Sequence, residues 1–147
     1  MSIFNAINVS ATGLTAERLR MDTISKNIAN ANTTRTSNGG PYRRQVVVFK
    51  TKEEPSFSKV LQETTNSNEK GSKGVEVVGI RQDQSPFKKV YEPGHPDANE
   101  EGYVMMPNVE VVTEMANMIS ASRGYEANIT ALNTTKNIAL KALELGK

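Results

Sequence analysis

The chain has 147 residues, with 18 basic against 16 acidic side chains, so its formal net charge is only +2. This length fits one ordinary domain or two small ones, and the near-neutral charge argues against a nucleic-acid or membrane-surface partner, which calls for a concentrated basic patch. Cysteine is absent, which excludes disulfides and thiolate zinc sites. Aromatic residues make up only 5%, so the core is expected to be aliphatic and thin, and self-association is one way to complete it.

The beginning of the sequence, Met1–Ser10, lacks the basic stretch and the unbroken apolar run of a cleavable secretory signal. The longest apolar runs fall far short of the roughly 20 residues that cross a bilayer. We therefore expect no direct insertion into a membrane. If the protein leaves the cytoplasm, we expect it to use a route that needs no signal cleavage.

Helical periodicity marks the first part of the chain, over residues 3–31. Its best apolar series recurs at steps of seven residues: Ile7, Leu14, Met21, Ile28. A second series, four residues earlier, is only partly apolar, so the pattern predicts one amphipathic helix. Gly13 costs about 1 kcal/mol inside such a helix, and it indicates either a bend or a close contact with another helix.

A stronger heptad pattern runs through the end of the chain, over residues 109–145. Two seven-step series, offset by four, form the seam: Val111, Met118, Tyr125, Leu132, Ala139 and Met115, Ser122, Ile129, Lys136, Leu143. Most of these positions are apolar or aromatic, which predicts a long helix with a coiled-coil-like seam. We expect Asn108 to cap its start and Gly146 to end it, with Glu110 and Glu114 favourably placed near the positive end of the helix dipole.

The middle of the chain has a different character. Four β-branched or aromatic runs predict strands, at residues 45–49, 75–80, 87–91 and 103–106. Polar stretches rich in glycine, proline or asparagine predict loops, at residues 33–42, 63–74 and 92–102. The fold class is therefore α+β: two long terminal helices that pair as an antiparallel, coiled-coil-like body, with a small β-rich insertion between them. The corresponding domains are a discontinuous helical domain, 1–33 and 108–147, and an inserted domain, 34–107.

Few residues suggest chemistry. The only histidine, His95, lies near Glu92 and Asp97 and could ligate a metal or act as an acid or base. A lone histidine without a second strong ligand is more often a turn residue whose ring makes a local hydrogen bond. No nucleophile–base pair accompanies it. We therefore expect no catalytic residues, no metal site and no cofactor, and we expect that the protein is not an enzyme.

Two polar groups suggest contacts with other molecules instead. Tyr42, Arg43 and Arg44 suit phosphate binding or base stacking, but adjacent arginines at the start of a strand more often form surface ion pairs or an interface contact. Asparagines in the helices, Asn27 and Asn30 among them, are either solvated or hydrogen-bonded laterally between packed helices. In a polymer the lateral arrangement is favoured.

Several stretches resemble known sequences. The N-terminal segments ATGLTAERLRM (11–21) and SKNIANANT (25–33) are similar to the signature of flagellar rod, hook and hook-associated proteins. The segments GGPYRR (39–44), PGHPDAN (93–99) and GYV (102–104) resemble the proximal-rod, FlgC-type subgroup. The segments PNVE (107–110), MISASR (118–123) and YEAN (125–128) resemble the C-terminal helix of the family.

This resemblance implies a structural subunit of the proximal rod of the bacterial flagellar basal body, located in the periplasm and exported without a cleavable signal peptide. Polymerisation through the terminal helices would transmit torque and form the wall of the export channel. The implied partners are other rod proteins, the rod–ring junction protein and the flagellar export apparatus, with self-association possible. The expected subunit interface comprises Ile7, Leu14, Met21, Asn27, Ile28, Asn30, Met115, Met118, Tyr125, Ile129, Leu132 and Leu143. The expected loop contacts are Tyr42, Arg43, Arg44 and His95.

Two other functions stay open at this point. A cytosolic coiled-coil adaptor or scaffold would explain the heptads equally well, but it would not explain the GGPYRR and PGHPD segments. A nucleic-acid-binding module would need a basic face and a steep dependence of binding on salt, which the near-neutral charge argues against.

Overall fold

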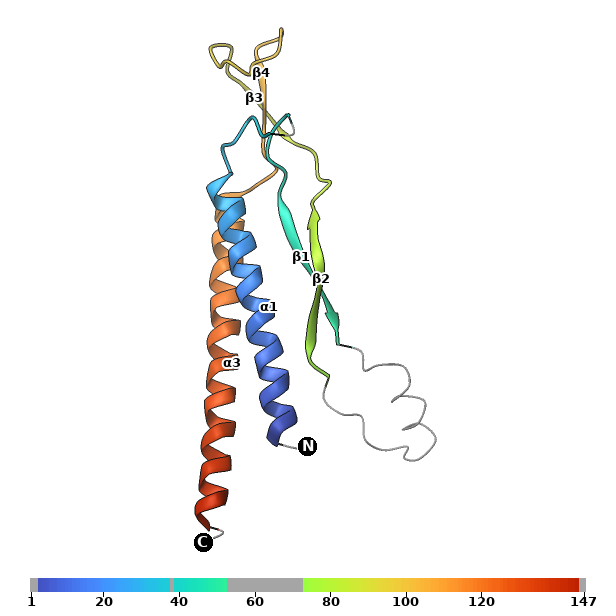
Figure 1. The fold of residues 1–147 in the computed structure, drawn as a ribbon. Helices are drawn as coiled ribbons and strands as arrows, with labels where there is room; N and C mark the ends of the chain where they lie inside the picture. The colour runs from blue at the N-terminus through green and yellow to red at the C-terminus, as the bar shows by residue number, and fades with distance from the viewer. Residues whose placement is uncertain (1–2, 38, 53–72, 146–147) are drawn as a thin grey trace, which may run out of the picture. The chain divides into compact units, whose positions relative to one another are not determined.

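The computed structural model describes residues 3–37, 39–52 and 73–145. Its elements are α1 (Ile3–Ala29), β1 (Gln45–Thr51), β2 (Val75–Gln82), β3 (Lys88–Tyr91), β4 (Tyr103–Met106) and α3 (Val111–Leu145), as Figure 1 shows. The predicted α+β class is confirmed, as are both helices and all four strands, with bounds shifted by a few residues. The predicted helix end at Gly146 and most of the predicted loop at 63–74 lie outside the described residues.

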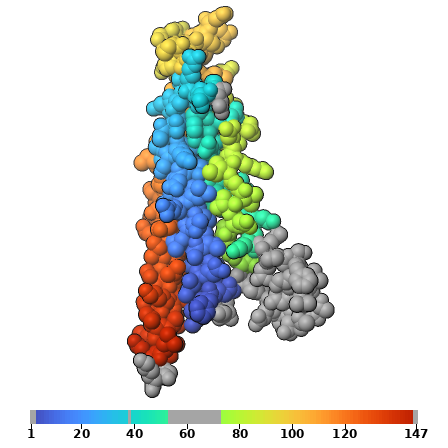
Figure 2. Space-filling model, viewed as in Figure 1, coloured from blue at the N-terminus to red at the C-terminus, as the bar shows by residue number. Residues whose placement is uncertain are grey.

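The chain forms two compact units, each held together by contacts among its own residues. Unit 1 comprises Met1–Arg18, Phe49–Val78 and Arg123–Lys147, and unit 2 comprises Leu19–Val48 and Gly79–Ser122. Each unit therefore contains a part of both terminal helices and a part of the strands between them. Within each unit, α1 and α3 run side by side in opposite directions, and their surfaces adjoin (Figures 1 and 2).

Small side chains bring the two helices of unit 1 close together. A Cβ atom added to Gly13 of α1 would lie 2.9 Å from the side-chain oxygen of Asn128, and one added to Gly124 of α3 would lie 3.3 Å from the Glu17 carboxyl carbon. Asn128 is held in place because its Nδ2 donates to the carbonyl of Gly124 at 2.9 Å. Of the two interpretations of Gly13, the close helix contact is therefore the one that the structure bears out.

The start of β2 contacts α1 in the same unit. The hydroxyl of Thr12 donates to the carbonyl of Val9 at 2.7 Å and accepts from the backbone N–H of Val75 at 3.1 Å. Gly74 lies directly against Thr12, and a Cβ there would approach the hydroxyl oxygen to 2.5 Å. Thr12 thus satisfies the first N–H of the strand.

Two small sheets form, each of two strands: β1 with β2, and β3 with β4. The β3–β4 hairpin is antiparallel and pairs Val90 with Val104 and Tyr91 with Tyr103. Successive side chains alternate between its faces, so Val104 is buried while Tyr103 and Met105 are exposed. The Tyr91 and Tyr103 rings meet edge to face with their centroids 5.3 Å apart, a favourable cross-strand contact.

Gly102 is required where the chain enters β4. Its φ is +81°, and a Cβ there would lie 2.9 Å from the ring of Tyr91. We expect Gly102→Ala to destabilise the hairpin by at least about 1–2 kcal/mol, because the left-handed conformation alone has that cost for an L-residue. Amide hydrogen exchange over β3 and β4 measures the effect. Gly94→Ala is the matched control, since nothing lies within 4 Å of its added Cβ, and an equal response of both variants would contradict the prediction.

The apolar core is thin. The buried hydrophobic residues among those described are Ala16, Ile24, Val47, Val104, Val109 and Ala121. Of these, only Ala16 belongs to unit 1. Two long helices that bury so little apolar surface gain little of the stabilisation that normally offsets the conformational entropy of ordering them. In the described part of the chain, no helix is long and apolar enough to span a membrane.

Candidate subunit interface

A buried polar cluster holds α1, β1 and α3 of unit 2 together. Its centre is Glu114 of α3, whose side chain is 1% exposed. The amide Nδ2 of Asn27 donates to Glu114 Oε2 at 2.9 Å and to the carbonyl of Gln45 at 2.8 Å. Asn27 Oδ1 accepts from the backbone N–H of Gln45 at 2.9 Å and from the hydroxyl of Tyr42 at 3.0 Å. The predicted interface residue Asn27 thus uses all of its hydrogen-bonding capacity within the chain.

Arg44 connects this cluster to the segment that follows β2. Its Nη2 lies 2.7 Å from Glu114 Oε1, its Nε donates to the same oxygen at 2.9 Å, and its Nη1 lies 3.2 Å from Asp83 Oδ2. Arg44 therefore forms ion pairs, as expected, but its main partner Glu114 is buried, so this pair does not lie on the surface. Arg43 instead stacks on the Phe87 ring at 4.3 Å and donates to the carbonyl of Asp83.

The prediction that Asn108 caps α3 is wrong. The helix begins at Val111, and the backbone N–H of Glu114 bonds to the carbonyl of Glu110. The side chain of Asn108 instead accepts from the backbone N–H of Arg44 at 2.8 Å and donates to the carbonyls of Asp83 and Ser85. Its short amide bridges Arg44 to the segment of Asp83 and Ser85, and this use competes with capping.

The charges of the cluster shift its pKa values. Burial raises the pKa of the Tyr42 hydroxyl, and the negative charge of Glu114 raises it further. Burial by itself would lower the pKa of Arg44, but hydrogen bonds and charges from Glu114 and Asp83 outweigh it, so the net shift is upward. The pKa of Asp83 is lowered, first by hydrogen bonds from the side chain and backbone of Ser85 and then by Arg44.

Asp83 makes unit 2 sensitive to acid. Because its folded-state pKa lies below its unfolded value, its stabilising contribution is present above about pH 4 and is lost as the pH falls through the lowered pKa. We expect Ser85→Ala to raise the pKa of Asp83, since the hydroxyl donates to Asp83 Oδ1 at 2.6 Å. An NMR titration of the carboxyl carbon measures this. The exposed neighbour Gln84, changed to Ala, is the control, and an unchanged Asp83 pKa in Ser85→Ala would contradict the assignment.

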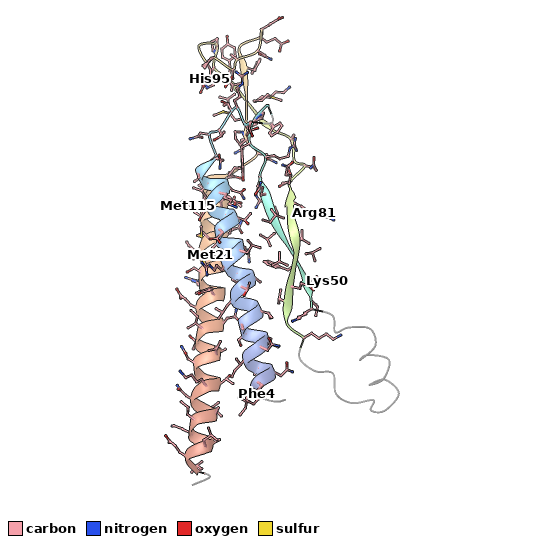
Figure 3. The ribbon with its side chains drawn as sticks, in the orientation of Figure 1. Phe4, Met21, Lys50, Arg81, His95 and Met115 are labelled. Atoms are coloured by element: carbon pink, nitrogen blue, oxygen red, sulfur yellow. The ribbon has the colours of Figure 1, made fainter. Side chains whose placement is uncertain are left out.

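Two of the loops singled out in the sequence meet in unit 2. The hydroxyl of Thr34 donates to Asp97 Oδ2 at 2.8 Å, and Arg35 lies 3.8 Å from Asp97 Oδ1. His95, labelled in Figure 3, accepts a hydrogen bond at Nδ1 from the backbone N–H of Asp97 at 3.1 Å. This is the local turn hydrogen bond expected of a lone histidine. Among the described residues, no group of three or more His, Cys, Asp or Glu side chains could hold a metal ion.

The face of α3 that is buried within the chain includes only one of the two series of the predicted seam. The two fully buried residues of α3, Glu114 and Ala121, lie seven apart beside the partly buried seam residues Met118 and Tyr125. That face continues in unit 1 with the contacts at Gly124 and Asn128. Asn27 is buried, and the other expected interface residues divide into two groups. Ile7, Leu14, Met21, Ile28, Asn30, Met118, Tyr125 and Leu132 are partly buried, and Met115 (Figure 3), Ile129 and Leu143 are exposed. Tyr42, Arg43, Arg44 and His95 are partly buried.

Further apolar side chains on the helices are exposed that the seam does not include: Ile3, Phe4, Val112, Ile119, Ile138, Leu140 and Leu145. These side chains are apolar surface that a neighbouring subunit can cover. Sequence periodicity missed these residues because they are spread over several faces of the helices. A helix pair within one chain needs only one apolar stripe on each helix. Large apolar residues outside that stripe are the sequence signal that could have identified these positions.

Comparisons with known proteins find matches over both terminal helices and over the whole chain. Residues 7–35 match the family described as "Flagella basal body rod protein", and residues 100–145 match "Flagellar basal body rod FlgEFG protein C-terminal". The chain is 48% identical to the flagellar basal-body rod protein FlgC of Bacillus subtilis over the whole of both sequences. It is 46% identical to that of Borreliella burgdorferi, covering 99% of this chain and 98% of the relative, and 40% identical to that of Salmonella typhimurium over the whole of both.

Proposed function

The chain belongs to the FlgC family of flagellar basal-body rod proteins, structural and non-enzymatic components of the proximal rod, and we propose that it polymerises through the exposed apolar faces of α1 and α3. The observation that carries this proposal is the imbalance between buried and exposed apolar side chains. Ile119 of α3 is 56% exposed and Leu143 is 71% exposed, whereas the helix buries only Glu114 and Ala121. Neighbouring subunits would supply the apolar contacts that the single chain lacks.

The polar cluster of unit 2 has a different role in this proposal. Glu114, Arg44 and Asn27 fix α1, β1 and α3 to one another by directional bonds that an apolar core would not specify. A subunit with a thin core thereby presents its apolar faces in a defined arrangement. Rod subunits that polymerise in this way would transmit torque and line the export channel.

The proposed partners and cellular location of the chain rest on its family membership. The family implies assembly with other rod components. We propose that these partners include the rod–ring junction protein, that the chain reaches the periplasm through the flagellar export apparatus without a cleavable signal peptide, and that it also contacts other copies of itself.

A deletion strain tests the function. Without this chain, we expect purified basal bodies to lack the rod beyond the membrane-embedded ring, cells to be non-motile, and a plasmid copy to restore both. An epitope-tagged copy should co-purify with basal bodies. Normal basal bodies and swimming in the deletion strain, with the tagged chain in the cytosol, would instead fit the alternative of a cytosolic coiled-coil adaptor and would overturn the proposal.

A further inference from the structure

The β3–β4 hairpin of unit 2, labelled in Figure 1, buries only one of its two faces. Val104 on the inner face is 1% exposed. The other face, termed the hairpin outer face here, consists of two cross-strand pairs: Lys89 with Met105, and Tyr91 with Tyr103. All four of these side chains are exposed, Tyr91 to 64%.

The hairpin outer face holds two of only four tyrosines in the chain. Of the other two, Tyr42 bonds within the polar cluster and Tyr125 is partly buried. Tyrosine is enriched where proteins contact one another, because its ring supplies a large contact area at a low cost in rotamer entropy. The placement of half the tyrosines on one exposed face therefore indicates a contact surface.

The two rings are held in place before any partner binds. They meet edge to face with their centroids 5.3 Å apart, and the Tyr91 ring lies so close to Gly102 that an added Cβ would approach it to 2.9 Å. The turn that joins the strands is fixed by two backbone bonds of 2.9 Å, from the N–H of Glu92 to the carbonyl of Gly102 and from the N–H of Gly102 to the carbonyl of Asn99. Because little freedom remains to be lost, such a surface binds at a low entropic cost.

The tip of the hairpin, beside these rings, is acidic. Residues 90–109 contain four carboxylates and no lysine or arginine. One of the four, Asp97, lies 3.8 Å from Arg35. The other three are exposed and form no ion pair with any residue that the structure describes: Glu92, Glu100 and Glu101. Aromatic faces and carboxylates both attract cations, so the rings and the tip agree on the charge of a partner.

We propose that the hairpin outer face binds an arginine-bearing segment of another rod protein, with the guanidinium on the Tyr91 ring and close to the carboxylates of the tip. Arginine suits both groups, because its planar guanidinium stacks on aromatic rings and donates to carboxylates. Met105 offers an adaptable apolar contact on the same face. Lys89 lies about 7 Å from Tyr91 along β3, away from the tip, so its charge directs the arginine toward the tyrosine end.

The inference rests on the proposed incorporation of the chain into the rod, where its family implies other rod components as neighbours. It adds a contact of aromatic and charged groups to the apolar contacts proposed for α1 and α3. Because this contact lies on a hairpin and not on the helices, the two contacts can fail separately.

Site-specific photo-cross-linking in assembled rods tests the inference. The variant Met105→p-benzoylphenylalanine, which carries a photoreactive side chain on the hairpin outer face, replaces the natural copy in cells. Basal bodies are purified and irradiated, and the cross-linked peptides are identified by mass spectrometry. We expect a peptide of a different rod protein that carries arginine near the cross-linked position. A peptide of this chain itself, or one without arginine, would overturn the inference.

Charge reversal at the tip tests the chemistry of the contact. Added to the photoreactive variant, Glu100→Arg/Glu101→Arg should lower the cross-link about tenfold or more, because it brings like charges together. The matched control Glu100→Asp/Glu101→Asp keeps both charges and should retain the cross-link. Changing the identified arginine of the partner to glutamate should restore the cross-link to the charge-reversed chain, which a purely structural effect on the hairpin would not allow. An equal yield from both double variants would overturn the inference.

The two proposals give different results when they fail. Rods that assemble and turn but yield no cross-link from position 105 would overturn the inference and leave the proposed function intact. Absence of the natural chain from purified basal bodies would instead overturn the proposed function, on which the inference rests.

Discussion

Arg44→Met is expected to cost unit 2 about 3–5 kcal/mol of unfolding free energy. The substitution leaves the Glu114 carboxylate, which is 1% exposed, without the guanidinium that neutralises it. Removing one partner of a buried pair has a cost of this size, because the remaining charge stays desolvated. Asp83 also loses an ion pair, although its carboxylate is more accessible to water.

Urea denaturation of the purified chain measures the effect, and Arg43→Met is the matched control. Arg43 is adjacent in sequence but contacts only the Phe87 ring and the Asp83 carbonyl in the described part of the chain, so its removal should cost about 1 kcal/mol. The double variant Arg44→Met/Glu114→Met should lose less than the sum of its single variants, because no buried charge remains. If Arg43→Met and Arg44→Met lower the free energy of unfolding equally, the prediction that Arg44 stabilises the buried Glu114 carboxylate is contradicted.

Ile129→Glu is expected to prevent incorporation into the rod while leaving the isolated chain nearly as stable as before. Ile129 is 37% exposed in the single chain, so a carboxylate there keeps access to water. If the residue is covered by a neighbour in the rod, the same carboxylate must be desolvated without a partner. That costs several kcal/mol, and about 3 kcal/mol corresponds to a more than hundredfold loss of association.

Swimming assays and immunoblots of purified basal bodies measure the assembly defect. Thr134→Glu is the control on the same stretch of α3, since Thr134 is exposed and already polar. Its carboxylate should leave motility close to normal. If Ile129→Glu swims like wild type at normal expression, Ile129 does not lie in the interface. The assignment of the seam to contacts between subunits would then be weakened.

The elements of the fold were predictable because each depends on local pattern. Apolar residues at intervals of seven predicted α1 and α3. Runs of β-branched residues predicted the bounds of the four strands to within a few residues. Gly13 was linked either to a bend or to a close helix contact, and the structure shows the close contact.

The arrangement of the helix surfaces was harder to predict. Apolar periodicity indicated a seam through Met115 and Leu143, but α3 buries Glu114 and Ala121 on another stripe. Small residues such as Gly124 allow close approach along this stripe, and apolar periodicity does not register small or polar residues. The contact face within the chain therefore shares Met118, Tyr125 and Leu132 with the apolar seam of the sequence and leaves Met115, Ile129 and Leu143 exposed.

The polar cluster could not be predicted, because its bonds join residues far apart in the sequence. Glu114 was expected only to favour the helix dipole, and it instead bonds to Arg44 and Asn27. Asn108 was expected to cap α3, and it instead bridges Arg44 and Asp83. Short polar side chains have several local partners available, and only the folded arrangement decides among them.

Hydrogen exchange on the dilute monomer and on assembled rods tests the central claim that assembly completes the core. Unit 1 buries only Ala16 among its described apolar residues, whereas unit 2 holds the remaining buried apolar residues and the Glu114 cluster. We therefore expect amides of residues 3–18 and 123–145 to exchange with little protection in the monomer and to become strongly protected in the rod. Residues 19–29 and 111–122 should be protected in both. Strong protection of both ranges of unit 1 in the monomer, unchanged by assembly, would contradict the claim.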